Sequence, residues 1–268
     1  MKLKIIIGIA IMIIIACIGA ILLYFFTGNV SSKIPDNIIK ECNVKEERYQ
    51  NRSVFVITPK ETNPNGQFIY YLHGGSYVAE LSTAHWKFLS KLAQDTKASI
   101  IVPDYPLTPQ YQYQETFRMV EPLYKVLAST VEKENLIVMG DSAGGGMALS
   151  LMEEIGKEED AKKPSKVILI SPWLDVSMEN PKIQEVEEKD KMLNRELLKM
   201  AGVAYAGSKE AVKEPLVSPI YGQIENVENL VIYTGTNDIL NPDVYVLKEK
   251  AKKKRNRYTS RRNSRSST

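Results

Sequence analysis

Short apolar runs alternate with longer mixed segments along most of this chain. Strands buried on both faces of a parallel sheet read as continuous apolar runs. Such runs lie at residues 54–57, 67–72, 99–102, 136–140, 167–170 and 230–233. Segments of helical length and spacing lie between several of them, at 83–93, 112–129 and 148–154. The pattern predicts βαβ units, so the expected fold class is α/β, with a mostly parallel central sheet and helices on both faces.

Three segments depart from this simple alternation. The turn Asn-Pro-Asn-Gly at residues 63–66 separates the first two apolar runs and predicts an early hairpin. Residues 35–50, before it, are predicted to be helical or irregular. The segment 172–229 is too long for one crossover. We expect extra helices there, over the carboxyl edge of the sheet, where open α/β sheets bind substrates.

The N-terminus carries a long apolar run without charge. Lys2 and Lys4 precede residues 5–26, which are long enough to cross a bilayer as a helix. A cleavable signal peptide usually has a shorter apolar core. The lipoprotein-like box ending at Cys17 is followed by apolar residues instead of polar ones. The sequence therefore predicts an uncleaved single-pass transmembrane anchor at residues 1–26, with the globular domain on the extracytoplasmic side of the membrane.

Length and charge define the rest of the organisation. The chain has 268 residues, enough for one sizeable core, which we expect at 27–251 with a cap or lid at 172–229. Residues 252–268 form a basic low-complexity tail with eight Lys or Arg and no acid. The remainder holds 27 basic against 32 acidic residues, so no nucleic-acid partner is expected. The two cysteines, Cys17 and Cys42, allow no internal disulfide framework.

The first chemical motif joins an apolar run to a helix-compatible segment at residues 136–147. The run ends at Gly140 and turns through Asp141 and Ser142. The central residue of such a turn has a strained backbone, so it needs small neighbours, here Gly140 and Gly144. This geometry raises Ser142 above the sheet edge as a candidate nucleophile. The alternative is a glycine-rich turn with a solvated serine.

A second motif follows the apolar run at 67–72. His73, Gly74 and Gly75 come at the carboxyl end of that predicted strand. Consecutive glycines let backbone N–H groups approach a ligand, and such donors can hold the oxyanion formed when a carbonyl is attacked. The N–H of Ala143 would complete this cradle. The alternative is a glycine turn that merely ends a strand.

These motifs together resemble the hormone-sensitive-lipase branch of the α/β-hydrolase fold, a family of carboxylesterases and lipases. The matching residues run in the family's order: His73-Gly74-Gly75, Asp104-Tyr105 with Leu107 and Pro109, the stretch from Gly140 to Gly145, Ser171-Pro172-Trp173, and Gly235 with Asp238, Leu240 and Asp243. The resemblance implies hydrolysis of a small-molecule carboxylic ester through an acyl-enzyme, without cofactor or metal. It implies Ser142 as nucleophile, Gly74, Gly75 and Ala143 as oxyanion donors, and Asp238 as the acid that orients the base.

Asp238 is also the best acid by position. It follows the run 230–233 in a loop at the sheet edge that carries Ser142, where a carboxylate could reach an imidazole. Asp243 follows a capping Asn-Pro pair and has a sufficient structural role beside a helix N-terminus. Asp175 and Asp190, in the covering segment, are predicted to be solvated.

The expected base is missing from the pattern. The resemblance implies a histidine on a loop after Asp238, following one more strand. The sequence has two histidines, His73 and His85, and both precede Ser142. We expect structural roles for both. After residue 251 the chain is rich in Lys, Arg and Ser without apolar periodicity, as the product of a shifted reading frame would be.

Three interpretations remain. An active esterase would need an unconventional base and ranks lowest. An esterase lineage whose frame is shifted, with the last strand and base loop missing and turnover crippled, is favoured. The alternative is a non-catalytic binding or scaffold protein that keeps the fold and uses its basic tail on a polyanion. The sequence does not indicate the acyl and alcohol groups of a substrate or the oligomeric state.

Overall fold

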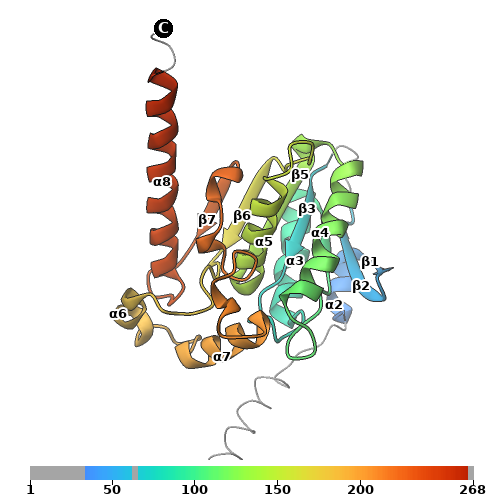
Figure 1. Cartoon of the computed structure of the whole chain (residues 1–268). Helices are drawn as coiled ribbons and strands as arrows, with labels where there is room; N and C mark the ends of the chain where they lie inside the picture. Colours follow the sequence, from blue (N-terminus) through green and yellow to red (C-terminus); the bar gives the residue numbers. More distant parts are fainter. Residues whose placement is uncertain (1–33, 62–65, 265–268) are drawn as a thin grey trace, which may run out of the picture.

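The computed structural model describes residues 34–61 and 66–264 of the chain. Its centre is a seven-stranded sheet in the order β1-β2-β4-β3-β5-β6-β7 (Figure 1). The strands are β1 (Cys42–Tyr49), β2 (Arg52–Pro59), β3 (Phe68–Leu72), β4 (Ser99–Pro103), β5 (Leu136–Asp141), β6 (Lys166–Ile170) and β7 (Leu230–Tyr233). Strands β3 to β7 are parallel to one another, whereas β1 and β2 are antiparallel to their neighbours. The predicted mostly parallel sheet is confirmed.

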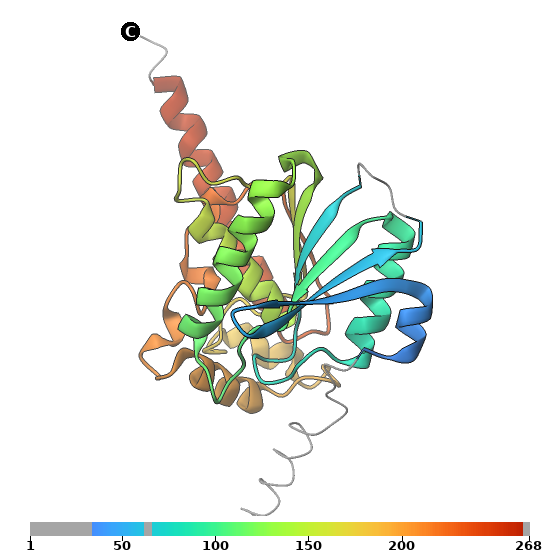
Figure 2. The same ribbon diagram turned by 90° about the vertical axis from the view of Figure 1, so that its right-hand side faces the viewer.

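Helices cover both faces of the sheet (Figure 2). One face carries α2 (Asp36–Glu41) and α3 (Thr83–Thr96), and the other carries α4 (Tyr113–Thr130) and α5 (Ser142–Ile155). Each face has its own buried apolar cluster, one containing Trp86 of α3 and the other Leu149 of α5. Successive residues of β3 alternate between the two clusters, because strand side chains point to opposite faces. Burial on both sides explains why the central strands read as continuous apolar runs.

The segment between β6 and β7 forms the cover expected at residues 172–229. It contains α6 (Gln184–Glu187) and α7 (Arg195–Ala206) together with the 3-10 turns η2 (Pro181–Ile183), η3 (Ala211–Lys213), η4 (Pro219–Tyr221) and η5 (Ile224–Asn226). A further turn, η1 (Lys133–Asn135), leads into β5. Figure 1 shows α6 and α7 at the lower end of the molecule, where α8 (Asn241–Ser264) begins. The prediction of extra helices in this segment is confirmed.

The predicted hairpin between residues 54–57 and 67–72 is wrong. Strand β2 pairs with β1 and β4, whereas β3 pairs with β4 and β5. The hairpin of this region is β1–β2, whose turn residues Gln50 and Asn51 have φ of +50° and +62°. Strand β1 escaped detection because it lies at the sheet edge with mostly exposed side chains, so it carries no apolar run.

Helix α8 continues through the predicted tail. It runs from Asn241 to Ser264 and extends well past the sheet (Figure 1). The predicted domain boundary at residue 251 therefore falls inside a helix. Within residues 34–61 and 66–264, no strand follows β7, and β7 pairs only with β6.

The prediction of a transmembrane helix is corrected. In the part of the chain that the structure describes, no helix is both long enough and apolar enough to cross a membrane. The longest helix, α8, is rich in lysine and arginine, which a bilayer core excludes. The predicted anchor at residues 1–26 lies outside the described residues. For the described residues the fold class is α/β, and the predicted extracytoplasmic, single-pass localisation has no support from this structure.

Candidate active site

The turn at Ser142 joins β5 directly to α5. Ser142 is the first residue of the helix and has φ of +50°, a left-handed conformation that few residues with a side chain adopt. The turn is so tight that a β-carbon on Gly140 would overlap the carbonyl group of Gly144. A β-carbon on Gly144 would overlap the carbonyl oxygens of Leu72 and His73. The strand-turn-helix geometry predicted around Ser142 is present.

The glycine loop, which follows β3 and consists of residues 73–77, lies against this turn. A β-carbon on Gly74 would overlap the Asp141 carboxylate and lie 3.1 Å from the β-carbon of Ser142. The Gly74 N–H donates to Asp141 Oδ1 at 2.8 Å. This N–H is therefore engaged by Asp141 in the structure, which favours the other two predicted oxyanion donors over Gly74. Gly75 and Ala143 are the two remaining candidates.

Asp141 holds several of these elements together. Its Oδ1 accepts from the Tyr71 hydroxyl at 2.7 Å as well as from Gly74, and its Oδ2 lies 3.3 Å from His85 Nε2. Burial alone would raise the pKa of Asp141, but the hydrogen bonds from His85, Tyr71 and Gly74 bring it below its ordinary value. Asp141 is therefore an anion at neutral pH, and its charge is satisfied inside the protein.

Ser142 and Asp238 line the same cleft. The cleft has a volume of about 660 Å³ and lies between the sheet edge and the cover. Its walls include Ser142, Ser171, Met192, Leu193, Asp238 and Leu240. The structure thus brings together the nucleophile and acid that were predicted from positions nearly a hundred residues apart. Among the described residues, no group of three or more His, Cys, Asp or Glu side chains is placed to bind a metal ion.

Asp238 is half-buried in the loop between β7 and α8. Its Oδ1 accepts from the Leu240 N–H at 2.8 Å. Burial raises the pKa of Asp238, the Leu240 and Ser171 hydrogen bonds oppose that shift, and the nearby Asp190 charge adds to it. Asp190 also bonds this loop directly, because the Ile239 N–H donates to its Oδ2 at 3.0 Å. The cover and the acid loop are thereby connected.

The prediction that Asp175 is solvated is wrong, whereas Asp190 is partly exposed in the cleft. Asp175 is buried and accepts from the Tyr221 hydroxyl at 2.8 Å. Asp190 accepts from three backbone N–H groups, those of Met192, Leu193 and Ile239. Both carboxylates order the covering segment, a role that depends on contacts which residue type and position do not reveal.

Asp243 has the structural role that was predicted for it beside the helix N-terminus. It lies in the first turn of α8 and is buried, and the Asn180 side-chain amide donates to its Oδ1 at 2.7 Å. Burial and the Asp175 charge outweigh the Asn180 hydrogen bond and raise the pKa of Asp243 to about 6. Asp243 does not line the cleft with Ser142. Of the two acids after β7, Asp238 remains the candidate.

Neither histidine lines the cleft. His73 is fully buried, stacks on Tyr105 with ring centroids 4.3 Å apart, and has its Nδ1 2.7 Å from the Gly74 carbonyl oxygen. Burial, reinforced by the nearby His85, lowers the pKa of His73 to about 4, so it is neutral at pH 7. His85 caps α3 and contacts Asp141. Both have structural surroundings, as expected.

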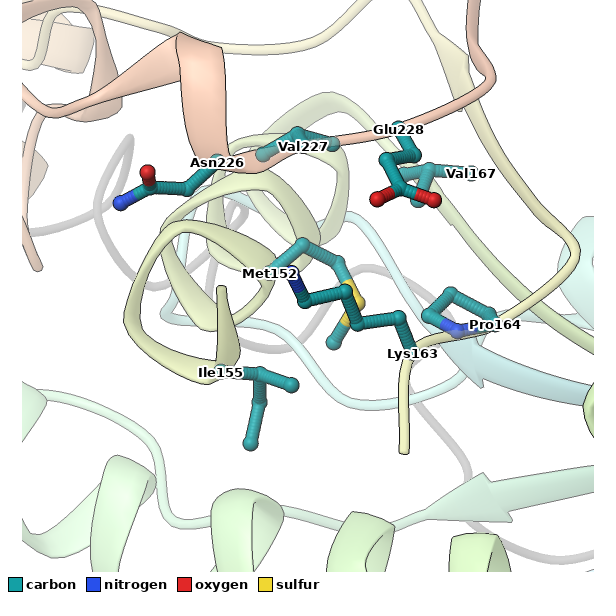
Figure 3. Close-up of a pocket in the computed structure, with 8 residues that line it drawn as sticks. All are labelled: Met152, Ile155, Lys163, Pro164, Val167, Asn226, Val227 and Glu228. Atoms are coloured by element: carbon teal, nitrogen blue, oxygen red, sulfur yellow. The ribbon is translucent and has the colours of Figure 1, made fainter. Parts of the chain in front are cut away.

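A second hollow lies elsewhere on the molecule. Figure 3 shows it between Met152 and Ile155 of α5, Val167 of β6 and the segment that leads into β7. Its volume is about 10 Å³, room for about one water molecule. It lies at the amino ends of the strands, opposite the edge that carries Ser142, and it is too small to hold a substrate.

Comparison with protein families gives one match over most of the chain. The sequence profile of a family described by its alpha/beta hydrolase fold matches residues 69–265. A triacylglycerol lipase of Mycobacterium tuberculosis is 31% identical over 233 residues, which cover 85% of this chain and 47% of the lipase. The matched region spans about a quarter to about two thirds of the length of the curated relatives.

Solved structures give the same fold. A candidate esterase from Staphylococcus aureus superposes with a TM-score of 0.76 at 27% identity, over 82% of this chain and 73% of the other. An esterase from the bacterial hormone-sensitive lipase family superposes with a TM-score of 0.74 at 23% identity, over 85% of this chain and 75% of the other.

Proposed function

This chain belongs to the α/β-hydrolase fold family, and we propose that its cleft is a carboxylic-ester hydrolase site of the hormone-sensitive-lipase type. One observation carries the proposal: Ser142 begins α5 at a left-handed turn, beside the glycine loop and in the same cleft as Asp238. The esterase and lipase names of similar proteins support it. The proposed substrate is a small-molecule carboxylic ester, whose apolar part would contact the wall at Leu193 and Leu240.

The proposed reaction is acyl transfer to Ser142. Its Oγ would add to the ester carbonyl, the bond to the alcohol oxygen would break, and the acyl group would remain on Ser142 until water removes it. The N–H groups of Gly75 and Ala143 are the proposed oxyanion donors, and the free N-terminus of α5 favours negative charge there. Asp238 is the proposed acid that would orient a base, supported by its place in the cleft.

The step that limits this chemistry is proton removal from Ser142. The nitrogens of His85 and the Nδ1 of His73 are engaged by other groups, and neither imidazole reaches the cleft. Loss of the base in a serine hydrolase lowers turnover by roughly 10⁶-fold, with a residual rate that depends on the oxyanion donors. We therefore propose that turnover by the described domain is severely reduced while the acylation site is retained.

A non-catalytic scaffold is the second candidate. It is favoured by helix α8, whose C-terminal half holds most of the basic residues and extends beyond the body (Figure 1). A polyanion would bind such an arm through charge, with strong dependence on salt. Binding to heparin that disappears when residues 252–268 are deleted would support this function, provided that Ser142 is unreactive.

Covalent labelling tests the principal proposal. An alkyl fluorophosphonate phosphonylates a reactive serine with loss of fluoride. We expect slow labelling of the full chain, located at Ser142 by mass spectrometry and abolished in Ser142→Ala. Absence of any labelling above that of Ser142→Ala would contradict the acylation site. Hydrolysis of p-nitrophenyl acetate at ordinary enzyme rates would contradict the reduced turnover.

A further inference from the structure

His85 occupies an unusual place at the start of α3. Ser82 is the N-cap, and its Oγ accepts from the His85 N–H at 3.2 Å. In return the Ser82 N–H donates to His85 Nδ1 at 3.0 Å. This is a reciprocal capping box, in which Glu or Gln normally holds the position that the imidazole has here.

The capping box fixes the tautomer of His85. A backbone N–H is always a donor, so the Nδ1 that accepts from the Ser82 N–H carries no proton, and the Ser82 hydroxyl, whose Oγ lies 3.0 Å from the same nitrogen, donates to it as well. A neutral imidazole then has its proton on Nε2. That nitrogen faces Asp141 Oδ2 at 3.3 Å. His85 therefore donates to Asp141, and neither of its nitrogens is available to take a proton from Ser142.

Asp141 connects His85 to the glycine loop through its two carboxylate oxygens. While Oδ2 accepts from His85, Oδ1 accepts from the Gly74 N–H at 2.8 Å and from Tyr71 at 2.7 Å. A carboxylate held at both oxygens has one orientation, whereas one held at a single oxygen can rotate about its side-chain bond. The side chain of His85 is only 18% exposed, so water replaces it poorly.

We propose that His85 is a positioning residue that, through Asp141, fixes the glycine loop against the Ser142 turn. Its donated hydrogen bond keeps Asp141 in the orientation that binds Gly74, and Gly74 in turn sets where the N–H of Gly75 points. This inference rests on the proposed function, because the loop matters for chemistry only if Gly75 and Ala143 hold an oxyanion. It assigns a role to the N-terminus of α3, which does not border the cleft.

The first test reads the tautomer without any substrate. Nitrogen-15 NMR of the full chain should show an unprotonated Nδ1 and a protonated Nε2 for His85 at pH 7. The sequence has two histidines, so the spectrum of His85→Gln assigns the signals. An unprotonated Nε2 on His85 would overturn the proposal, since the donor to Asp141 would then be absent.

The second test compares two substitutions of His85 that both preserve the N-terminal cap of α3. Glutamine and glutamate at position 85 both complete the capping box with Ser82, so α3 stays capped in either variant. Only glutamine also offers an N–H donor to Asp141. Glutamate places a second carboxylate against it.

Slow fluorophosphonate labelling of Ser142 at pH 8 is the measurement. We expect His85→Gln to retain labelling within about threefold of the unaltered chain and His85→Glu to lose roughly tenfold or more, less than the loss on removing an oxyanion donor outright. Circular dichroism and thermal unfolding should show both variants folded. Equal labelling of two folded variants would overturn the positioning role.

These outcomes are separate from those of the proposed function. If the unaltered chain is not labelled at Ser142, the acylation site itself is wrong, whatever the tautomer. If Ser142 is labelled and the two variants do not differ, only the role of His85 is wrong. If His85→Glu fails to fold, His85→Leu supplies the comparison, because it removes the donor to Asp141 without adding charge. Labelling of folded His85→Leu equal to that of His85→Gln would then overturn the proposal.

Discussion

The ring of Tyr205 in the cover lies parallel to the ring of Tyr77 in the glycine loop, with centroids 3.6 Å apart and an angle of 5° between the planes. Both side chains are almost fully buried. Trp173, just after β6, extends the stack with its ring centroid 5.6 Å from that of Tyr77. Tyr77 follows Ser76, and both have left-handed φ, so the loop depends on its surroundings to keep this shape. The stack fastens the cover to the loop beside Ser142.

Two substitutions of Tyr205 should differ sharply. Tyr205→Ala removes a buried ring and should lower the free energy of unfolding by about 3–5 kcal/mol. Tyr205→Phe keeps the ring and removes a buried hydroxyl that has no hydrogen-bond partner among the described residues, so it should be neutral or slightly stabilising. Urea unfolding measures both. A large loss in Tyr205→Phe would show that the hydroxyl has an unrecognised partner.

Gly144 should tolerate no side chain. A β-carbon there would overlap two backbone carbonyl oxygens, which cannot move without shifting β3 or α5. We expect Gly144→Ala to destabilise the protein by about 3 kcal/mol or more. Gly235→Ala is the matched control, because the nearest atom to a β-carbon there lies 3.8 Å away. Thermal unfolding that ranks the two variants equally would contradict the close packing of α5.

Glu153 should make the fold less stable as pH rises. It is buried in α5, and burial, only partly offset by the Lys250 charge, raises its pKa to about 8. The unfolded chain releases this proton near pH 4.3. Between about pH 4.5 and 8 the folded state therefore holds more protons than the unfolded state, and stability falls with increasing pH.

Glu153→Gln removes this titration. We expect it to raise the free energy of unfolding by about 1–3 kcal/mol at pH 8 and by clearly less at pH 5. Urea unfolding at the two pH values makes the comparison, with the exposed Glu159→Gln as control. An equal effect at both pH values would mean that Glu153 is ionised in the folded protein.

Asp190 should influence the acid of the cleft. Its charge contributes to the raised pKa of Asp238, and its Oδ2 accepts from the N–H of Ile239 next to it. Asp190→Asn keeps an oxygen acceptor and removes the charge, so the pKa of Asp238 should fall. Carbon-13 NMR titration of the Asp238 carboxyl measures this. Asp160→Asn, an exposed change outside the cleft, should leave that titration unaltered.

The strands that could be predicted are those whose burial on both faces produces a continuous apolar run in the sequence. Strands β4 and β5 have helices on both faces, so nearly every residue is apolar and the run is visible. Strand β1 lies at the sheet edge with mostly exposed side chains, so its sequence contains no continuous apolar run. Residues 63–66 are typical of a turn, but a turn motif does not determine which strands pair with each other. Strand β4, more than thirty residues further on, lies between β2 and β3.

The same distinction holds for the site. Ser142 and the glycine loop were visible because their glycines are local requirements of a tight turn. The engagement of Gly74 by Asp141 was not visible, since the two residues are 67 positions apart and only the folded sheet joins them. The contact of Tyr205 with Tyr77 is hidden for the same reason. A histidine three residues after Ser82, where a capping box normally has Glu or Gln, was the one local sign of the role of His85.

The left-handed backbone at Ser142 lowers the stability of the fold at the position that the proposed chemistry requires. An L-residue in this conformation costs about 1–2 kcal/mol, and glycine is free of that strain. Selection for stability alone would replace this serine by glycine, and Ser142→Gly should unfold at a higher temperature than Ser142→Ala although alanine is the smaller chemical change. Under the proposed function, position 142 retains an oxygen nucleophile at the expense of stability, the trade-off expected where a residue is kept for its reactivity.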